Sequence, residues 1–214
     1  MNFQLSISNF QLPKVYPITD CRLSGLTHAE QVEKMIAGGA KFIQLREKYA
    51  SPKDFFAQAK LALEIARKMD VKIIINDRVD IALALKADGV HLGQDDFPPT
   101  EARKILGQNA IIGFSTHSSS QIIEALKLPI DYAAIGPVFD TKTKENPDET
   151  VGIETIGRIR KSIGNFPLVA IGGINSGNIS KVLAAGADSA AIISDLFGKS
   201  DEITRRMKEF LSLK

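Results

Sequence analysis

The sequence contains little cysteine and lacks any long apolar stretch. Cys21 is the only cysteine among 214 residues, which excludes an internal disulfide and a multi-cysteine metal cluster and suits a reducing cytoplasm. Runs of about 18 apolar residues are absent, so we expect no transmembrane helix. Residues 1–14 have neither the basic start nor the continuous apolar core of a signal peptide. We therefore expect a cytoplasmic protein with no membrane partner.

An excess of charge of one sign is also lacking. Lys and Arg number 27 and Asp and Glu 25, for a formal net charge of +2. A broad basic surface for nucleic acid is not expected, so any basic site must be local. Hydrophobic residues make up 44% and charged residues 24% of the chain, as in ordinary globular domains with a sizeable core.

Eight short apolar runs alternate with segments of helical periodicity. The runs are mostly rich in Val and Ile and do not alternate strictly, which is typical of strands buried on both faces. They span residues 15–19, 42–45, 72–75, 89–92, 111–114, 132–135, 168–171 and 189–193. The helical segments span residues 29–37, 52–69, 77 or 78–85, 99–106, 119–126, 153–162, 176–185 and 201–213.

This order of elements predicts a parallel sheet with crossover helices. Eight strand–helix units are the number that closes a (β/α)8 TIM barrel, which we place at residues 14–214 after an N-terminal extension of residues 1–13. An open doubly wound sheet is the alternative. The G-x-G-x-x-G pattern is missing after the first strand, which argues against the dinucleotide-binding version of that alternative.

The segment Gln44-Leu45-Arg46-Glu47-Lys48 places unusual charge at the end of a strand. Because successive side chains point to opposite faces, Gln44, Arg46 and Lys48 would converge on one side. One amide and two cations suit a phosphate or diphosphate, since Arg offers a fork of donors and Lys a point charge. The alternative is a solvated strand end.

Carboxylates follow two neighbouring strands. Asp77 follows the third strand, and the Asp95-Asp96 pair follows the fourth. Two carboxylates facing one pocket suit Mg²⁺, which completes its shell with water and phosphate oxygens. Each residue could instead cap a helix, and Asp77 stands well placed for that role.

Glycines and a long polar loop follow the later strands, at the same predicted edge of the sheet. Gly172-Gly173 follows the seventh strand and Ile193-Ser194 the eighth, where barrels commonly bind phosphate through backbone N–H groups. The alternative is a plain tight turn. The loop of residues 137–152 is polar and lacks periodicity, which favours a lid over a merely solvated loop.

The histidines and the cysteine are weaker signals. We expect His28 to be a surface or helix-capping residue and Cys21 to have no role in the chemistry. His91 ends a strand beside the predicted metal ligands, so we expect it to line the pocket. His117 also ends a strand, where a structural and a catalytic role are equally compatible with the pattern.

Taken together, these segments resemble the thiamine phosphate synthase family. The matching motifs are QLREK, IND, HLGQDD, GFSTH, GPVFDTKTK, AIGGI and IISD, in that family's order, from Val15 to the last helix. The resemblance implies a transferase that joins 4-amino-2-methyl-5-(diphosphooxymethyl)pyrimidine to a thiazole phosphate (carboxythiazole or hydroxyethylthiazole phosphate). The products would be thiamine phosphate and diphosphate, formed through a cationic pyrimidine methylene.

The resemblance also implies the site residues. Magnesium would be the cofactor, held by Asp77 and Asp96, and the catalytic residues would be Arg46, Lys48, Ser115 and Lys144. The two small phosphorylated substrates would contact Gln44, Leu45, Arg46, Glu47, Lys48, Asn76, His91, Ser115, Thr141, Lys142, Thr143, Lys144, Gly173, Ile193 and Ser194. The oligomeric state is left open, and a homodimer is compatible with the sequence.

One departure and two alternatives accompany this interpretation. The family usually has Pro where this chain has Asp140, which removes a fixed φ from the loop. The related thiazole tautomerases share the barrel and a histidine like His117 but typically lack the full set of Lys48, Asp77, Asp96 and Lys144. A catalytically silent phosphate-binding regulatory module is the alternative from another class.

Overall fold

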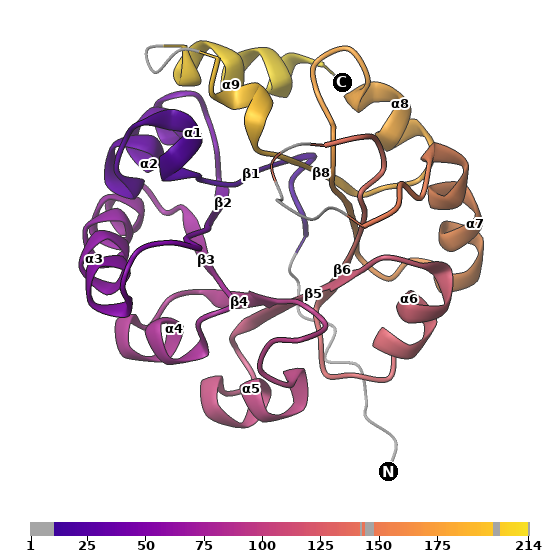
Figure 1. Ribbon diagram of the computed structural model, residues 1–214, viewed down its shortest axis with the longest axis horizontal. Coiled ribbons are helices and arrows are strands. Elements are labelled where there is room, and N and C mark those ends of the chain that lie inside the picture. The colour runs from indigo at the N-terminus through magenta and orange to yellow at the C-terminus, as the bar shows by residue number, and fades with distance from the viewer. Residues whose placement is uncertain (1–10, 142, 144–147, 199–201, 214) are drawn as a thin grey trace.

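The computed structural model describes residues 11–141, 143, 148–198 and 202–213. Within these residues, eight parallel strands follow the order β1-β8-β7-β6-β5-β4-β3-β2. A parallel bridge between Ile18 and Gln44 joins β1 to β2, so the sheet closes into a barrel (Figure 1). The predicted (β/α)8 barrel is confirmed, and the open doubly wound sheet is excluded.

The strands agree closely with the predicted apolar runs. They are β1 (Val15–Pro17), β2 (Phe42–Leu45), β3 (Lys72–Asn76), β4 (Gly89–Leu92), β5 (Ile111–Thr116), β6 (Tyr132–Ile135), β7 (Leu168–Ala170) and β8 (Ser189–Ile192). The strand β5 extends two residues beyond its predicted end because Ser115 and Thr116 pair with Ala134 and Ile135 of β6.

The helices form a ring around the strands (Figure 1). They are α1 (Cys21–Ser24), α2 (His28–Ala37), α3 (Pro52–Lys68), α4 (Val79–Leu85), α5 (Pro99–Leu106), α6 (Ser119–Ala125), α7 (Ile153–Ile163), α8 (Ile179–Ala184), the 3₁₀ helix η1 (Ser194–Leu196) and α9 (Ile203–Ser212).

Two short helices and one helix start differ from the sequence expectation. The elements α1 and η1 were not predicted, because three or four residues are too few to show helical periodicity. The first is capped by Asp20, whose side chain accepts hydrogen bonds from the N–H groups of Arg22 and Leu23. The helix α8 begins at Ile179, three residues later than predicted, because the Asn175 and Asn178 side chains bind backbone N–H groups of the preceding turn.

The barrel buries apolar side chains on both faces of its strands. Side chains on the outer face, such as Ile43 and Leu45 of β2, pack in the main core against the helices. Side chains on the inner face form a second cluster of Tyr16, Ile18, Phe42, Ile74, Ile111, Tyr132, Ala134, Val169 and Ala191. This inner cluster fills the barrel, so a ligand can be bound only at one of its ends.

The N-terminal segment and the helix lengths bear on two further expectations. Residues 1–10 of the predicted extension lie outside the described residues, and Leu12 packs against the inner cluster. In the described part of the chain, none of the helices combines the length and apolar character that crossing a membrane requires.

Candidate active site

A cavity of about 570 Å³ lies where the carboxyl ends of the strands meet. Its floor is the top of the inner cluster, including Tyr16, Ile18, Ala134, Val169 and Ala191. The walls bring together most of the residues singled out from the sequence, namely Gln44, Arg46, Lys48, Asn76, Asp77, His91, Asp96, Ser115, Thr141, Thr143, Gly173, Ile193 and Ser194. Parallel strands place all these chain segments at one edge of the sheet.

Two of the expected substrate-binding side chains point elsewhere. Leu45 is fully buried in the main core outside the barrel. The Glu47 carboxylate accepts hydrogen bonds from the N–H groups of Tyr49 and Ala50 and approaches His28. The expectation that these two side chains contact substrate is therefore corrected, because strand alternation turns them away from the cavity. Lys142 and Lys144 lie outside the described residues.

A chain of buried hydrogen bonds crosses the cavity floor. Gln44 Nε2 donates to the Tyr16 hydroxyl at 2.9 Å, and the Tyr16 and Tyr132 hydroxyls lie 3.0 Å apart. The Tyr132 hydroxyl lies 2.9 Å from His91 Nδ1, and His91 Nε2 lies 2.8 Å from Ser115 Oγ. The chain thus connects two side chains of the cavity wall, Gln44 and Ser115, through three buried rings.

Which group donates in each of these hydrogen bonds follows from the Gln44 amide at one end of the series. The Tyr16 hydroxyl accepts from the Gln44 amide, and among the described residues its proton has only the Tyr132 hydroxyl to bind; in this arrangement Tyr132 donates in turn to His91 Nδ1. His91 Nε2–H then donates to Ser115 Oγ, which leaves the Ser115 proton free to bind an anion in the cavity. Burial lowers the pKa of His91 to about 4, so this imidazole is neutral and can hold both bonds at neutral pH.

We expect Tyr132→Phe to lower the free energy of unfolding by about 1–3 kcal/mol, because it strips a buried hydrogen-bond partner from both Tyr16 and His91. It should also lower kcat, since His91 would no longer hold Ser115. Denaturant unfolding and steady-state kinetics measure the two effects. Tyr49→Phe is the matched control, because Tyr49 is 52% exposed. Equal stabilities of the two variants would contradict the network.

The carboxylates after β3 and β4 face each other across the cavity wall. Asp77 adopts φ +61°, a left-handed conformation that a non-glycine residue rarely takes. Its N–H donates to the His91 carbonyl, and its carboxylate is hydrogen-bonded to Lys48 Nζ. The helices α4 and α5 lack a side-chain cap hydrogen bond, so neither carboxylate serves as the helix cap that was the alternative.

These carboxylates suit a divalent cation. Burial raises the pKa of Asp77, and the adjacent Asp96 carboxylate raises it further, while Lys48 opposes both effects. Asp96 also accepts the Gly93 N–H at 2.6 Å, which orients it. Two adjacent carboxylates are a set of hard oxygen donors of the kind that a cation such as Mg²⁺ prefers.

The two cations that follow β2, Arg46 and Lys48, are each paired with a carboxylate. Arg46 Nη1 donates to Asp20 Oδ2 at 2.8 Å, and the Arg46 side chain is 15% exposed. Because this pair uses one arm of the guanidinium, its other N–H groups remain to bind an anion. Arg46 and Lys48 therefore reach the cavity already oriented.

The glycine turn after β7 leaves its backbone open to the cavity. Gly172 and Gly173 have φ of +100° and +63°. A Cβ on Gly173 would lie 2.5 Å from the Asp140 carbonyl oxygen and 2.7 Å from Phe139 Cβ. Only glycine fits where this turn packs against the loop after β6, beside Ile193 and the start of η1.

Sequence reasoning gave too little weight to several cavity residues. Tyr16 sits inside an apolar run, so no local signal marks it. Gln94 Nε2 donates to the Ser115 carbonyl, and His117 Nδ1 lies 2.8 Å from the Gly136 carbonyl and 3.4 Å from Asp148 Oδ2. His117 thus ties the β5 end to the loop after β6. Its position at a strand end was the only available signal.

Comparisons with known proteins match most of the chain. Residues 15–196 match the family model described as thiamine monophosphate synthase. Thiamine-phosphate synthases from Clostridium novyi and Chloroflexus aurantiacus are 45% and 39% identical over 201 and 210 residues. They align with 94% and 98% of this chain and with 98% and 96% of their own lengths. The solved thiamine phosphate pyrophosphorylase from Pyrococcus furiosus is 38% identical, with a TM-score of 0.83 and 94% of each chain covered.

Proposed function

Because the chain belongs to the thiamine monophosphate synthase family and is a transferase that makes thiamine phosphate, we propose how its residues divide the work. Gln44 and Asn76 bind the pyrimidine, while Arg46, Lys48 and Ser115 bind its diphosphate. The backbone of Gly173, Ile193 and Ser194 binds the thiazole phosphate. The observation that carries this division is that the carboxylates, the cations and the glycine turn all line one cavity.

The chemistry follows from the charge of the leaving group. When the C–O bond to the pyrimidine methylene breaks, negative charge grows on the diphosphate, and Arg46 and Lys48 can stabilise it. Magnesium held by Asp77 and Asp96 would neutralise further charge there. The thiazole nitrogen then attacks the cationic methylene, so the described side chains need supply no nucleophile. Their main contribution is to orient two substrates and exclude water.

The decisive experiment is an assay with both substrates and magnesium. The purified protein should release diphosphate and form thiamine phosphate in equal amounts, only when both substrates are present. Isomerisation of the thiazole phosphate alone would favour the tautomerase alternative. Phosphate binding without turnover would favour the regulatory module.

We expect Gly173→Ala to raise the KM for the thiazole phosphate at least tenfold, with a much smaller change in the KM for the pyrimidine. The added Cβ would press on Asp140 and Phe139 and deform the turn. Gly107→Ala is the control, because Gly107 also has positive φ (+84°) but open space around its Cβ position. Equal changes in both KM values would contradict the assignment of this turn.

Location and assembly remain predictions of the sequence. We propose that the protein acts in the cytoplasm, where its one thiol would stay reduced; the oligomeric state is left open by the sequence, and a homodimer is compatible with it. Light scattering of the purified protein tests the second point.

A further inference from the structure

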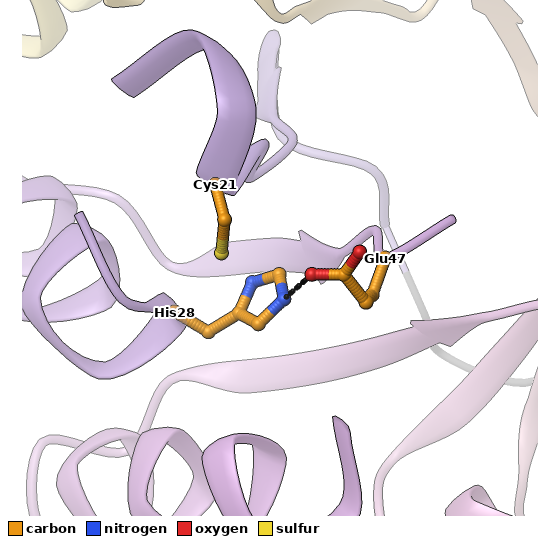
Figure 2. Close-up of side chains that lie close together, drawn as sticks. All are labelled: Cys21, His28 and Glu47. Atoms are coloured by element: carbon orange, nitrogen blue, oxygen red, sulfur yellow. Dashed lines mark ion pairs between the residues drawn. The ribbon is translucent and has the colours of Figure 1, made fainter. Parts of the chain in front are cut away.

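Three side chains to which we assign no role in the reaction converge on the outer face of the barrel, near the strand end that carries Arg46 and Lys48. They are Cys21 of α1, His28 at the start of α2 and Glu47 after β2 (Figure 2). The Cys21 sulfur, an imidazole nitrogen of His28 and a Glu47 carboxylate oxygen all lie within 4.8 Å of one another. Sequence reasoning missed this cluster because it expected His28 to be a surface or helix-capping residue, whereas His28 is fully buried.

The hydrogen bonds of His28 leave one ring nitrogen without a partner. His28 Nδ1 lies 2.7 Å from Thr19 Oγ1, and that hydroxyl donates its own proton to the Gln44 carbonyl. When the Thr19 proton bonds the Gln44 carbonyl, Nδ1 carries the ring proton and donates to Thr19, and Nε2 then presents a bare lone pair. Within the described residues, this buried Nε2 has no hydrogen-bond partner.

The lone pair faces a carboxylate. His28 Nε2 lies 3.4 Å from Glu47 Oε2, and in this tautomer two acceptors face each other and repel. Burial lowers the pKa of His28 against the opposing effect of Glu47, and the N–H groups of Tyr49 and Ala50 help to lower the pKa of Glu47 despite its partial burial. Proton sharing between the two is thus weakened, and a cation placed between them would remove the repulsion.

We propose that Cys21, His28 and Glu47 form a binding site for a borderline-soft divalent metal ion of the zinc class. Thiolate, imidazole and carboxylate are the donors that Zn²⁺ takes in proteins. Tetrahedral bonds of about 2.0–2.3 Å separate ligand atoms by roughly 3.4–3.6 Å. The imidazole–carboxylate distance already matches this range, and the sulfur has about 1 Å to move.

The surrounding side chains also suit a metal site. Thr19 orients the imidazole through Nδ1, the usual arrangement for a histidine ligand. Gln31 Nε2 donates to the Cys21 sulfur at 3.6 Å, which would stabilise a thiolate. With three protein ligands, the fourth position would hold water. The same ion would link α1, α2 and the end of β2, and so brace the strand end that carries Arg46 and Lys48.

A nucleophilic cysteine is the rival interpretation of a Cys–His–Glu cluster. Burial, together with the charges of Glu47 and Asp20, raises the pKa of Cys21 to about 12, so the thiol is poorly suited to attack a substrate unless a cation replaces its proton. The cluster also faces away from the cavity that binds the substrates. A buried imidazolium–carboxylate pair is the second rival, and it would need no metal.

The test uses Co²⁺ as a spectroscopic probe. Cys21 is the only cysteine, so a sulfur-to-cobalt charge-transfer band can report on this site alone. Wild-type protein should develop the band to saturation at one Co²⁺ per chain, and Zn²⁺ should abolish it by competition. Elemental analysis of the purified protein should find zinc near one equivalent when zinc is supplied during expression.

Variants separate this site from the magnesium site. Cys21→Ser should lose the band, and Glu47→Gln should bind Co²⁺ at least tenfold more weakly while its amide oxygen keeps the N–H contacts of Tyr49 and Ala50. Asp77→Asn should leave the band unchanged. Circular dichroism confirms that each variant folds. Absence of the band in folded wild-type protein at millimolar Co²⁺, or retention of full Co²⁺ affinity in Glu47→Gln, would overturn the proposal.

Discussion

Asp77→Asn is expected to lower kcat by two to three orders of magnitude while leaving the fold intact. The carboxylate is the proposed magnesium ligand from β3, and it also pairs with Lys48 beside the diphosphate. Loss of one group that stabilises charge growing in the transition state typically lowers kcat by about 10²–10³. Steady-state kinetics at several magnesium concentrations measures the loss.

The choice of Asn separates chemistry from backbone strain. Asp77 has φ +61°, and Asn tolerates this left-handed region better than Ala does. Asp80→Asn is the matched control, because Asp80 is an exposed acid in the first turn of α4 that pairs with Arg78. Its kcat should stay within twofold of wild type. Undiminished turnover of the wild type in excess chelator would refute the metal assignment.

Gly113→Ala is expected to lower the free energy of unfolding by about 3 kcal/mol, at the upper end for overpacking in a core. A Cβ on Gly113 would lie 2.1 Å from Tyr132 Cζ, 2.3 Å from its hydroxyl and 2.5 Å from His91 Nδ1. Both rings are buried inside the barrel, so neither can move away without breaking the hydrogen-bond chain to Ser115. Denaturant unfolding monitored by circular dichroism measures the loss.

Gly157→Ala is the matched control for this prediction. Gly157 lies inside α7, where an added Cβ would meet only the Ala185 carbonyl oxygen, at 3.6 Å. Alanine should therefore raise stability there by about 0.5–1 kcal/mol, because it is the better helix former. If Gly113→Ala unfolds at the same denaturant concentration as wild type, the packing of the cavity floor is not as tight as these distances require.

Much of the fold could be predicted from local pattern. Strands buried on both faces need continuous apolar residues, so the runs at 42–45, 89–92 and 132–135 match β2, β4 and β6 residue for residue. Eight strand–helix repeats then leave few topologies, and parallel strands put all their carboxyl ends at one edge. For the same reason Arg46, Lys48, Asp77 and Ser115 could be expected to share one cavity before any contact was known.

Other features depend on contacts between residues far apart in the chain. Tyr16 and Tyr132 are 116 positions apart, and only closure of the barrel brings their hydroxyls to 3.0 Å. Whether Asp77 caps a helix or faces the cavity depends on its φ, which the neighbouring strand sets through the Asp77 N–H and the His91 carbonyl. Local sequence carries no information about such pairings.

The cluster on the outer face of the barrel shows most clearly which features follow from local sequence and which depend on tertiary contacts. Alternation along an extended segment by itself determined that Glu47 would point away from Gln44, Arg46 and Lys48, although the family resemblance placed Glu47 among the substrate contacts. The sequence by itself also determined that one cysteine could form no internal disulfide. Only the tertiary structure decided that His28, predicted locally to be a surface or helix-capping residue, would be buried between Thr19 and Glu47 beside Cys21. The physical reason is that packing of α2 against the barrel, and not local periodicity, sets what surrounds the first residue of that helix.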